Sequence, residues 1–292
     1  MAMAPELLVL AAGMGSRYGG LKQIDPVGPS GETLLDYAVF DAIRAGFGRV
    51  VFVIRREFEG AFRAAVTAKY AGRIECAVVF QDMSDLPGGR AAPAPRQKPW
   101  GTGHAVWCAR DEVRAPFAVV NADDFYGAAS YASLSAFLRG AGGEGYAIVG
   151  FRLADTLSER GSVSRGVCRT TGGRLTSITE EVSILPSDVG PGRRFSGSEV
   201  VSMNCWAFTP AVFGGLGERL RAFLEQRGAD PGAELYLPTA VSELIQAGRA
   251  SVEVLAGGEP WFGITHRGDR ERAVAAIAGL VRSGAYPGRL FG

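Results

Sequence analysis

Short apolar runs alternate with segments of helical periodicity along the first half of the chain. Between residues 33 and 47, apolar positions recur every three or four residues and line one face of a helix. Continuous apolar runs, typical of strands buried on both faces, surround it. The predicted strands cover 7–12, 49–54, 74–80 and 116–122, and further helices are predicted at 57–70 and about 103–111. This alternation predicts a sheet that is parallel at its centre, with helices on both faces.

The second half of the chain has a different pattern, with several strands and few helices between them. The predicted strands cover 145–151, 161–169, 174–181 and 200–208. We expect them to complete the sheet and to add an antiparallel extension. Helices at about 210–226 and 234–247, a strand at 251–255 and a last helix from about 269 follow. Because no linker separates the halves, we predict one domain, 1–292, with lobes at about 1–128 and 129–292.

Two segments combine proline, glycine and basic residues with little apolar periodicity, at 83–99 and 186–198. Long loops in compact domains are often lids or binding loops. We expect both segments to be mobile, and a tolerated surface insertion is the alternative interpretation of each.

Composition narrows the function classes. The 31 basic and 30 acidic residues give a formal net charge of +1, whereas nucleic-acid surfaces are usually clearly basic. No apolar run reaches the roughly 18 residues that span a bilayer, and the start of the chain lacks the basic region of a secretory signal. Four cysteines without a CxxC pair indicate buried thiols in a reducing compartment, so we expect a cytoplasmic protein. Two histidines, His104 and His266, argue against a His-based zinc site.

The stretch LLVLAAGMGSRYGGLKQ, residues 7–23, leads from a strand through a glycine-rich turn. Such a turn lets backbone N–H groups approach a phosphate. The dinucleotide fingerprint fails because Tyr18 stands at its third glycine, and the Walker pattern fails because Leu21 follows Gly20. Arg17 and Lys22 lie just beyond the glycines. Together with the backbone amides they could neutralise the β- and γ-phosphates of a nucleoside triphosphate, which leave as pyrophosphate.

The segment LAAGMGSRYGGLKQ closely resembles the signature loop of sugar-1-phosphate nucleotidyltransferases, and later motifs follow in the family's order over most of the chain. The resemblance implies a Rossmann-like α/β three-layer sandwich with a mixed, mainly parallel central sheet, of the nucleotide-diphospho-sugar transferase type. It also implies that lobe 1–128 binds nucleotide and that lobe 129–292 binds sugar. The nucleotide-binding positions implied in the loop are Ala11, Ala12, Gly13, Met14, Gly15 and Ser16.

The strand end at Gln81 and the segment KPWGTGHAV (98–106) resemble the family's base-recognition pair. Gln81 can donate and accept hydrogen bonds, as a pyrimidine edge requires, although a glutamine amide can flip to suit several bases. Gly101 and Gly103 permit close approach of a base, and a helix could begin at Thr102. An ordinary helix start is the alternative interpretation of 101–103. We expect a structural role for His104.

The motif VVNADDFYG (119–127) places Asp123 and Asp124 directly after a buried strand. Carboxylates at the carboxyl end of a central strand suit a Mg²⁺ ion that bridges triphosphate oxygens, although paired carboxylates also occur as simple caps. In the family, the first acidic residue of this motif binds the metal. The resemblance therefore assigns Asp123 to the metal and gives Asp124 a supporting place behind it.

The closing segment EPWFGITHRGD (259–269) resembles a family segment in which tryptophan is followed by Leu-Asp, and that aspartate is the second metal ligand. Here Trp261 is followed by Phe262 and Gly263, so the carboxylate is absent at the matching place. Asp269 is the candidate replacement, and the alternative is that it caps the last helix. Mg²⁺ usually retains several waters, so it could still bind through Asp123, phosphates and water.

Three further motifs resemble the sugar site of the family. The resemblance implies that Gly166 offers its backbone to the sugar and that Glu180 accepts hydrogen bonds from sugar hydroxyls. Asn204 is a candidate sugar ligand, with a core turn as the alternative. Glu181 stands where the family usually has a lysine, which puts in doubt how the acceptor phosphate is held. Arg193 and Arg194 are candidates to replace that lysine.

The resemblance implies the reaction NTP + sugar 1-phosphate → NDP-sugar + pyrophosphate. Positioning and charge neutralisation by Arg17, Lys22 and a Mg²⁺ ion on Asp123 would carry it. A cytidylyltransferase acting on phosphocholine or another small phosphorylated alcohol is an alternative that Glu181 favours. A metal-dependent glycosyltransferase and a non-catalytic nucleotide-sugar-binding homologue also remain. The sequence contains no hexapeptide repeat, so we expect no left-handed β-helix domain. The sequence does not define the base of the nucleotide or the acceptor. It also leaves the oligomeric state undefined, and a homo-oligomer is one possibility.

Overall fold

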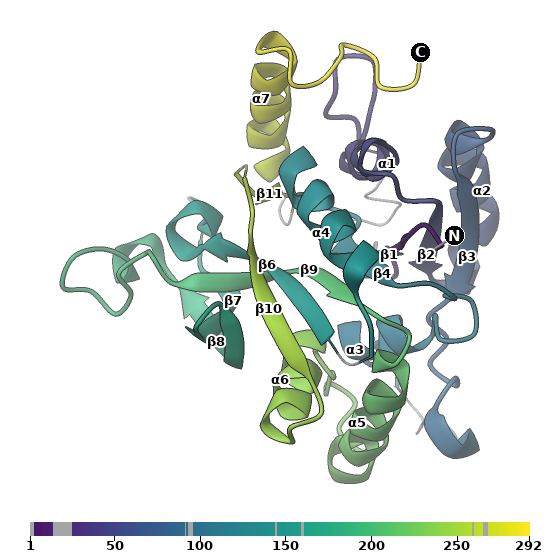
Figure 1. Ribbon diagram of the computed structural model, residues 1–292, viewed down its shortest axis with the longest axis vertical. Coiled ribbons are helices and arrows are strands. Elements are labelled where there is room, and N and C mark those ends of the chain that lie inside the picture. The colour runs from purple at the N-terminus through teal and green to yellow at the C-terminus, as the bar shows by residue number, and fades with distance from the viewer. Residues whose placement is uncertain are drawn as a thin grey trace.

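The computed structural model describes residues 3–13, 25–90, 92, 96–143, 145–158, 161–258, 260–264 and 268–292. Its centre is one mixed sheet of nine strands in the order β3-β2-β1-β4-β9-β6-β10-β8-β7 (Figure 1). A small second sheet pairs β5 (Asp124–Phe125) with β11 (Phe262–Gly263). The predicted α/β class with a mixed sheet is therefore confirmed.

Four parallel strands form one half of the sheet: β1 (Glu6–Leu10), β2 (Arg49–Ile54), β3 (Glu75–Phe80) and β4 (Phe117–Asn121). Leu10 pairs with Val53 on one side and with Asn121 on the other. The chain builds β2 and β3 on one side of β1 and then places β4 on the opposite side. The strand order therefore reverses between β1 and β4, and ligands of open α/β sheets bind outside the carboxyl ends of strands at such a point.

Helices cover both faces of the sheet because alternate residues of its strands point to opposite sides. Leu7 and Val9 pack with α1 (Leu34–Ala45) and α4 (Ala128–Gly140), together with Phe62 of α2 (Glu59–Ala65). Leu8 and Leu10 pack against the opposite layer. That layer consists of α3 (Thr102–Trp107), α5 (Val212–Arg227) and α6 (Leu237–Gln246). The three layers agree with the predicted sandwich.

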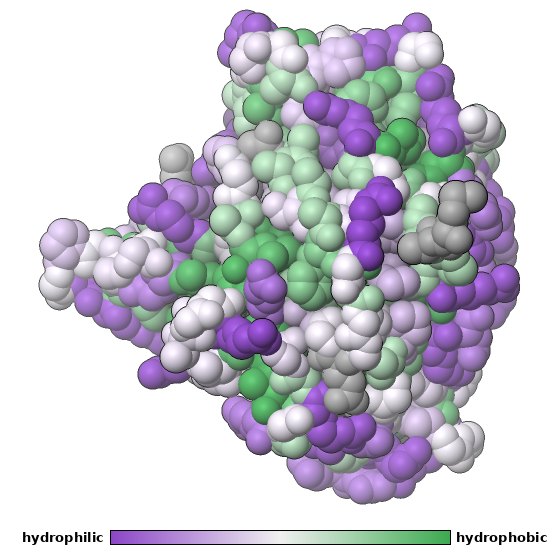
Figure 2. All heavy atoms as spheres, viewed as in Figure 1, coloured by the Kyte–Doolittle hydropathy of each residue, from purple (hydrophilic) through white to green (hydrophobic). Residues whose placement is uncertain are grey.

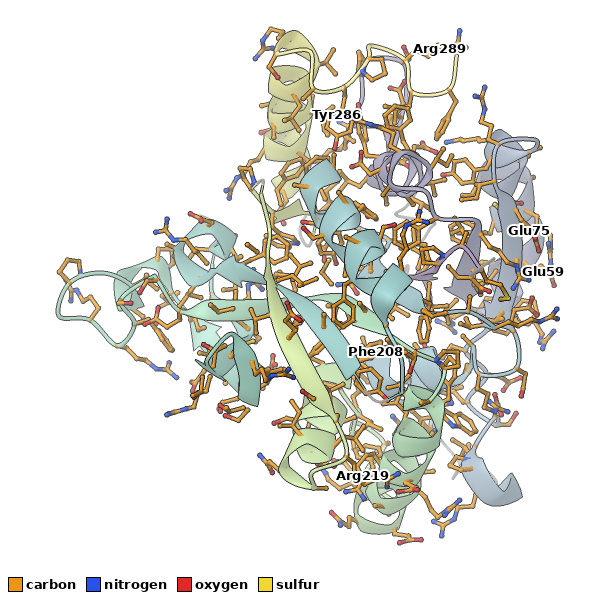
Figure 3. The ribbon with its side chains drawn as sticks, in the orientation of Figure 1. Glu59, Glu75, Phe208, Arg219, Tyr286 and Arg289 are labelled. Atoms are coloured by element: carbon orange, nitrogen blue, oxygen red, sulfur yellow. The ribbon has the colours of Figure 1, made fainter. Side chains whose placement is uncertain are left out.

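The last helix, α7 (Asp269–Arg282), packs outside these layers on an aromatic cluster. Tyr37 and Tyr286 meet edge to face at 5.2 Å, and Phe125 stacks on Phe262 at 4.5 Å. Figure 3 labels Tyr286 beside α7 and Phe208 near the middle of the molecule, above α5. On the face in Figure 2, apolar residues gather over the middle of the molecule, where α4 and β10 lie, and hydrophilic residues cover the rim. In the described part of the chain, no helix combines the length and apolarity needed to span a membrane.

Five strands of the second half close on themselves: β6 (Gly145–Arg152), β7 (Val163–Thr171), β8 (Arg174–Ile184), β9 (Val200–Phe208) and β10 (Ser251–Ala256). The pairings β9–β6, β6–β10, β10–β8, β8–β7 and β7–β9 complete a ring. The expected antiparallel extension is present in β7, β8 and β9, and its closure into a ring was not predicted. Closure pairs both edges of β7, whereas an open extension would leave one edge exposed. Among the described strands of the second half, β6 and β10 pair in parallel and the other pairs are antiparallel. The nine-stranded sheet thus has four parallel and five antiparallel pairs, so the prediction of a mainly parallel sheet was wrong.

Strand β9 joins the parallel half to the ring because its two ends have different neighbours on one edge. Residues 206–208 pair with β4, and residues 200–202 pair with β7. Strand β6 occupies the other edge of β9. The change of partner falls at Asn204, one of two described non-glycine residues with a positive φ (+58°). We call this branching the β9 fork; it opens between the end of β4 and the start of β7.

One predicted helix is interrupted, and one helix was missed. The helix expected at 57–70 is interrupted, since α2 ends at Ala65 and short 3₁₀ turns flank it at Arg56–Phe58 and Thr67–Tyr70. The β-branched Val66 and Thr67 at the break disfavour a continuous helix. Helix α4 was not predicted, because alanine and serine dilute its apolar stripe.

The segments expected to be mobile are anchored at several described residues. In 83–99, the Arg96 guanidinium donates to the carbonyl oxygens of Pro99 and Asp230, both at 3.1 Å, and lies 3.4 Å from the Trp100 ring centroid. In 186–198, Val189 and Phe195 form a β-bridge. All four cysteines are free thiols, as predicted, and Cys108, Cys168 and Cys205 are buried, whereas Cys76 is only partly buried.

Candidate active site

The first sequence motif ends at the point where the strand order reverses. Ala11 and Ala12 are buried beyond β1, and the Ala11 N–H donates to the carbonyl of Val53 at 2.8 Å. A Cβ atom built on Gly13 would meet no atom of the described residues within 4 Å. The predicted positions Met14, Gly15, Ser16, Arg17 and Lys22 lie outside the described residues.

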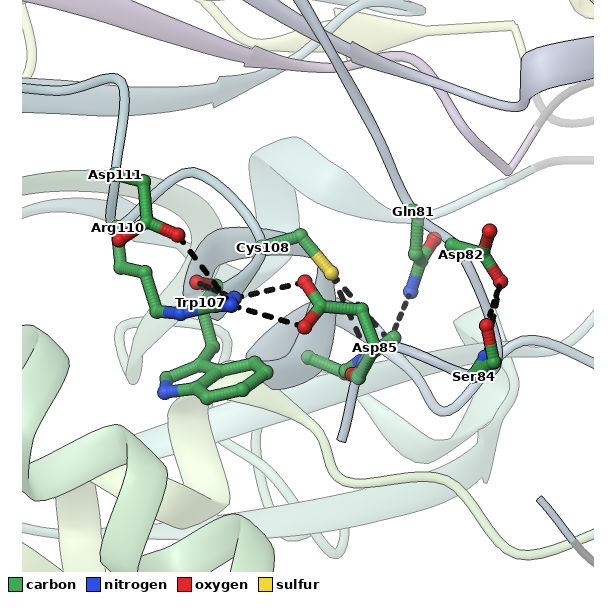
Figure 4. Close-up of polar contacts among 9 residues, drawn as sticks. Gln81, Asp82, Ser84, Asp85, Trp107, Cys108, Arg110 and Asp111 are labelled. Carbon is green, nitrogen blue, oxygen red and sulfur yellow. Dashed lines mark hydrogen bonds and ion pairs between the residues drawn. The ribbon is translucent and has the colours of Figure 1, made fainter. Parts of the chain in front are cut away.

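Gln81 follows β3 at the same edge of the sheet, and its side-chain amide is held in one orientation (Figure 4). Its Nε2 donates to the carbonyl of Gly101 at 2.9 Å and lies 3.3 Å from Nδ1 of His104. His104 is fully buried, and its Nε2 lies 2.8 Å from the carbonyl oxygen of Asp85, so Nε2 carries the ring proton and Nδ1 accepts. Burial lowers the pKa of His104 and keeps the ring neutral.

The orientation of Gln81 decides what it offers a ligand. Both Nε2 hydrogens have acceptors within the protein, and no described residue donates to Oε1. Gln81 therefore presents an acceptor, which suits a base edge that carries an N–H donor. The structural role predicted for His104 takes a specific form here, since the histidine fixes the glutamine amide.

A supporting network lies behind His104, and sequence reasoning missed it. The guanidinium of Arg110 donates to both carboxylate oxygens of Asp85, at 2.7 and 2.9 Å, and lies 3.8 Å from the Trp107 ring centroid (Figure 4). Asp85 belongs to the proline- and glycine-rich segment, where no spacing pattern marks it. The network holds Asp85, whose carbonyl oxygen accepts the hydrogen bond from Nε2 of His104.

The glycines of the second motif make close contacts with another loop. Gly101 has φ of +95°, and a Cβ atom there would lie 2.6 Å from the carbonyl oxygen of Leu235. The N–H of Gly103 donates to the same oxygen at 2.9 Å, and Oγ1 of Thr102 accepts from the N–H of Leu237 at 2.9 Å. Helix α3 begins at Thr102, as predicted. These residues therefore join the Gln81 region to α6.

Asp123 and Asp124 lie just beyond β4. Asp123 is half-buried, whereas Asp124 is buried and accepts hydrogen bonds from Asn121 at 2.8 Å and from the Tyr126 hydroxyl at 3.1 Å. Burial, followed by the negative charge of Asp123, raises the pKa of Asp124 to about 7. Asp123 thus faces the more open side, while Asp124 is embedded in the protein.

Gly263 lies directly beside Asp124, because β11 pairs with β5. A Cβ atom on Gly263 would lie 2.2 Å from Oδ1 of Asp124 and 2.9 Å from Cζ2 of Trp261. The carboxylate that the family motif would supply at position 263 is absent, and the carboxylate of Asp124 occupies the adjoining space. Sequence reasoning identified the loss at Gly263 but not its neighbour, because a two-residue strand pair has no pattern of its own.

Carboxylates suited to a magnesium ion are present, but they do not form a complete set of protein ligands. Among the described residues, no group of three Asp, Glu, His or Cys side chains is arranged to hold a metal. Mg²⁺ is often bound by one or two carboxylates plus substrate phosphates and water, which the adjacent Asp123 and Asp124 could satisfy. Asp269 is the first residue of α7, where a negative charge also favours the helix N-terminus.

The predicted acceptor residues lie on three strands of the ring. Gly166 pairs with Glu180 and with Ser202, and a Cβ atom on Gly166 would lie 3.6 Å from Oε2 of Glu180. The pKa of Glu180 is raised, because the effect of its partial burial outweighs the opposing effect of the positive charge of Arg165. Asn204 has a left-handed backbone, and its buried Oδ1 has no hydrogen-bond partner among the described residues. Strained backbone and an unpaired buried oxygen are typical of functional positions.

Glu181, which replaces the family's lysine, forms an ion pair with Arg194. Arg194 is about half exposed, and its charge is directed to Glu181. Of the two candidates to replace the lysine, Arg194 is therefore already engaged by a carboxylate.

Comparisons with known proteins identify the fold. No protein-family model matches the sequence, and no curated protein matches it. The structure is similar to that of the inositol-1-phosphate CTP transferase from T. maritima, with a TM-score of 0.63, 16% identity and coverage of 96% of this chain and 97% of the other. It is also similar to UDP-glucose pyrophosphorylase complexed with UDP-glucose, with a TM-score of 0.59, 18% identity and coverage of 95% and 99%.

Both similar structures are nucleotidyltransferases, and the likeness extends over nearly the whole of each chain. At these identities it shows the fold. The resemblance to sugar-1-phosphate nucleotidyltransferases that the motifs indicate is thus confirmed for the fold.

Proposed function

We propose that the protein is a nucleotidyltransferase that transfers a nucleoside monophosphate from an NTP to a sugar 1-phosphate, giving an NDP-sugar and pyrophosphate. One observation carries this proposal. Gly13, Gln81 and Asp123 follow β1, β3 and β4 at one edge of the sheet, where the strand order reverses. The acceptor residues Gly166 and Glu180 belong to the ring on the other side of the β9 fork.

In the proposed reaction, a phosphate oxygen of the acceptor attacks the α-phosphorus in line, and pyrophosphate leaves. The nucleophile is already an anion, so no general base is required. Gln81 would accept a hydrogen bond from the base, and Arg17 and Lys22 would neutralise the leaving phosphates. Asp123, supported by Asp124, would hold a Mg²⁺ ion, which neutralises phosphate charge when bound.

A second candidate is the transfer of CMP to a small phosphorylated alcohol. Two observations favour it. One of the similar structures is a CTP transferase for inositol 1-phosphate. Glu181 also departs from the family's lysine and is paired with Arg194. Both candidates share one chemistry and differ in the base and the acceptor.

The test is a pyrophosphate-release assay that crosses ATP, CTP, GTP, UTP and dTTP with sugar 1-phosphates, inositol 1-phosphate and phosphocholine in Mg²⁺. Release that requires one NTP and one acceptor supports the proposal and names the substrates. Lys22→Ala should then lose most of kcat, because its charge acts on the leaving phosphates. Full turnover by Lys22→Ala would refute the assigned role. Nucleotide binding without release for any pair would instead favour a non-catalytic homologue.

A further inference from the structure

A cavity of about 330 Å³ adjoins the strand-end carboxylates, between the start of β7, β11 and the first turn of α7. Its walls include Thr156, Ser164, Arg165, Trp261, Gly263 and Asp269. The volume is within the range of small-molecule pockets. Two arginines that the sequence motifs did not assign, Arg165 and Arg272, line the cavity, and Arg165 lies on the strand that carries Gly166.

Hydrogen bonds to Thr156 and Ser164 hold the guanidinium of Arg165 in one orientation. Nε donates to Oγ1 of Thr156 at 3.1 Å, Nη1 donates to the carbonyl of Ser164 at 2.8 Å, and Nη2 donates to the carbonyl of Thr156. Its Cζ lies 5.2 Å from the ring centroid of Trp261. Among the described residues, three of the five N–H donors have acceptors, and two remain for a ligand in a pre-set orientation.

The charge of Arg165 is partly buried and has no salt-bridge partner among the described residues. Burial lowers the pKa of Arg165, while the negative charges of Asp124 and Glu180 raise it from beyond salt-bridge distance. Removing a cation from water without a close partner is costly. A bound anion at the two remaining donors would offset that cost.

The position of Arg165 indicates which anion it would meet. Its neighbour Gly166 lies against Glu180, the candidate ligand of acceptor hydroxyls. On the other side, Trp261 contacts Gly263, which in turn lies against Asp124. Arg165 thus lies between the acceptor carboxylate and the carboxylates at the end of β4. In the proposed reaction, the group between the acceptor hydroxyls and the α-phosphorus is the acceptor's own phosphate.

We propose that Arg165 binds the phosphate of the acceptor and takes the place of the lysine that Glu181 replaces. This inference rests on the proposed function. A guanidinium can bind two phosphate oxygens at once, and its fixed orientation would also aim the attacking oxygen. Arg165 is a catalytic residue in this proposal, because it touches the nucleophilic group.

The test compares wild type with Arg165→Met and Arg165→Lys, and with Arg169→Met as the matched control. Arg169 is an exposed arginine on the same strand and the same face. Calorimetry measures the binding of inositol 1-phosphate, glucose 1-phosphate and inorganic phosphate to each protein. Arg165→Met should weaken phosphate-monoester binding by on the order of 10- to 100-fold. The phosphate-monoester affinity of Arg165→Lys should lie between those of wild type and Arg165→Met. The affinity of Arg169→Met should equal that of wild type.

The affinity for NTP should stay within about twofold in every variant, because the assignment separates the two phosphate sites. Should Arg165→Met fail to fold, Arg165→Lys decides, with circular dichroism showing that its fold is kept. Equal phosphate affinity in wild type and the folded Arg165 variants would overturn the inference, as would a wild type that binds none of the three probes.

Turnover separates this inference from the proposed function. If wild type releases pyrophosphate and the Arg165 variants keep its KM for the acceptor, the inference fails and the function stands. If phosphate binding depends on Arg165 but no NTP yields pyrophosphate, the phosphate site stands and the function fails.

Discussion

Replacing Gly263 with alanine tests the contact between β11 and Asp124. The added Cβ would lie 2.2 Å from Oδ1 of Asp124 and 2.9 Å from Cζ2 of Trp261. Both distances are shorter than a carbon atom tolerates, so a side chain or β11 must move. The φ angle of Gly263 is outside the left-handed region, so the backbone accepts alanine and the effect is steric.

Overpacking of this kind costs about 1–3 kcal/mol. In a chain of this size each kcal/mol lowers Tm by roughly 2–4 °C, so Gly263→Ala should lower Tm by several degrees. The measurement is scanning calorimetry in EDTA, which keeps metal binding out of the comparison. Gly214→Ala is the control, because a Cβ atom there meets nothing within 4 Å and alanine favours its helix α5.

A double-mutant cycle identifies the atom responsible. Asp124→Ala removes Oδ1 and leaves the amide of Asn121 without its acceptor, which costs about 1–3 kcal/mol. In that background the alanine at 263 has more room, so its cost should fall by at least about 1 kcal/mol. The reasoning is refuted if Gly263→Ala costs the same in both backgrounds, because the carboxylate would then not fill the adjoining space.

Two further predictions concern the Gln81 region. Gly101→Ala should destabilise the protein by at least about 2 kcal/mol in urea unfolding, since its φ is +95° and its Cβ would clash with Leu235; Gly88→Ala, with positive φ but open space, measures the strain alone. The pKa of His104 lies below the ordinary 6.5, so as pH falls through that value the unfolded state takes up the proton first and stability falls. Tm of His104→Gln should therefore fall less than that of wild type between pH 7 and 5, and parallel curves would contradict the assignment.

The sequence predicted the parallel half of the sheet well, for a physical reason. Strands β1, β2 and β4 are buried on both faces and are therefore continuous apolar runs, and the partly buried edge strand β3 has a similar run. Glycine, amide or carboxylate residues follow the ends of β1, β3 and β4. Gln81 and Asp123 were placed correctly beyond β3 and β4 because a strand end is a local property. Their roles toward base and metal stay predictions.

The ring and the contacts around Gly263 could not be predicted, because they depend on which distant segments pair. Nothing in the composition of 251–256 indicates that this strand lies between β6 and β8. Arg165 looked like an ordinary polar strand residue. Its importance appears only when Thr156 and Trp261, nine residues before and 96 after it, are brought beside it.

The closed ring has a consequence for the order of folding. The β7–β8 hairpin joins strands adjacent in sequence and can form early. The ring as a whole spans residues 145–256 and cannot close until β10, its last strand in the chain, is available to β6 and β8. Pairings between distant segments form slowly. The four parallel strands end at Asn121, so a nascent chain can build the sheet edge that carries Gly13, Gln81 and Asp123 well before the ring has its final shape.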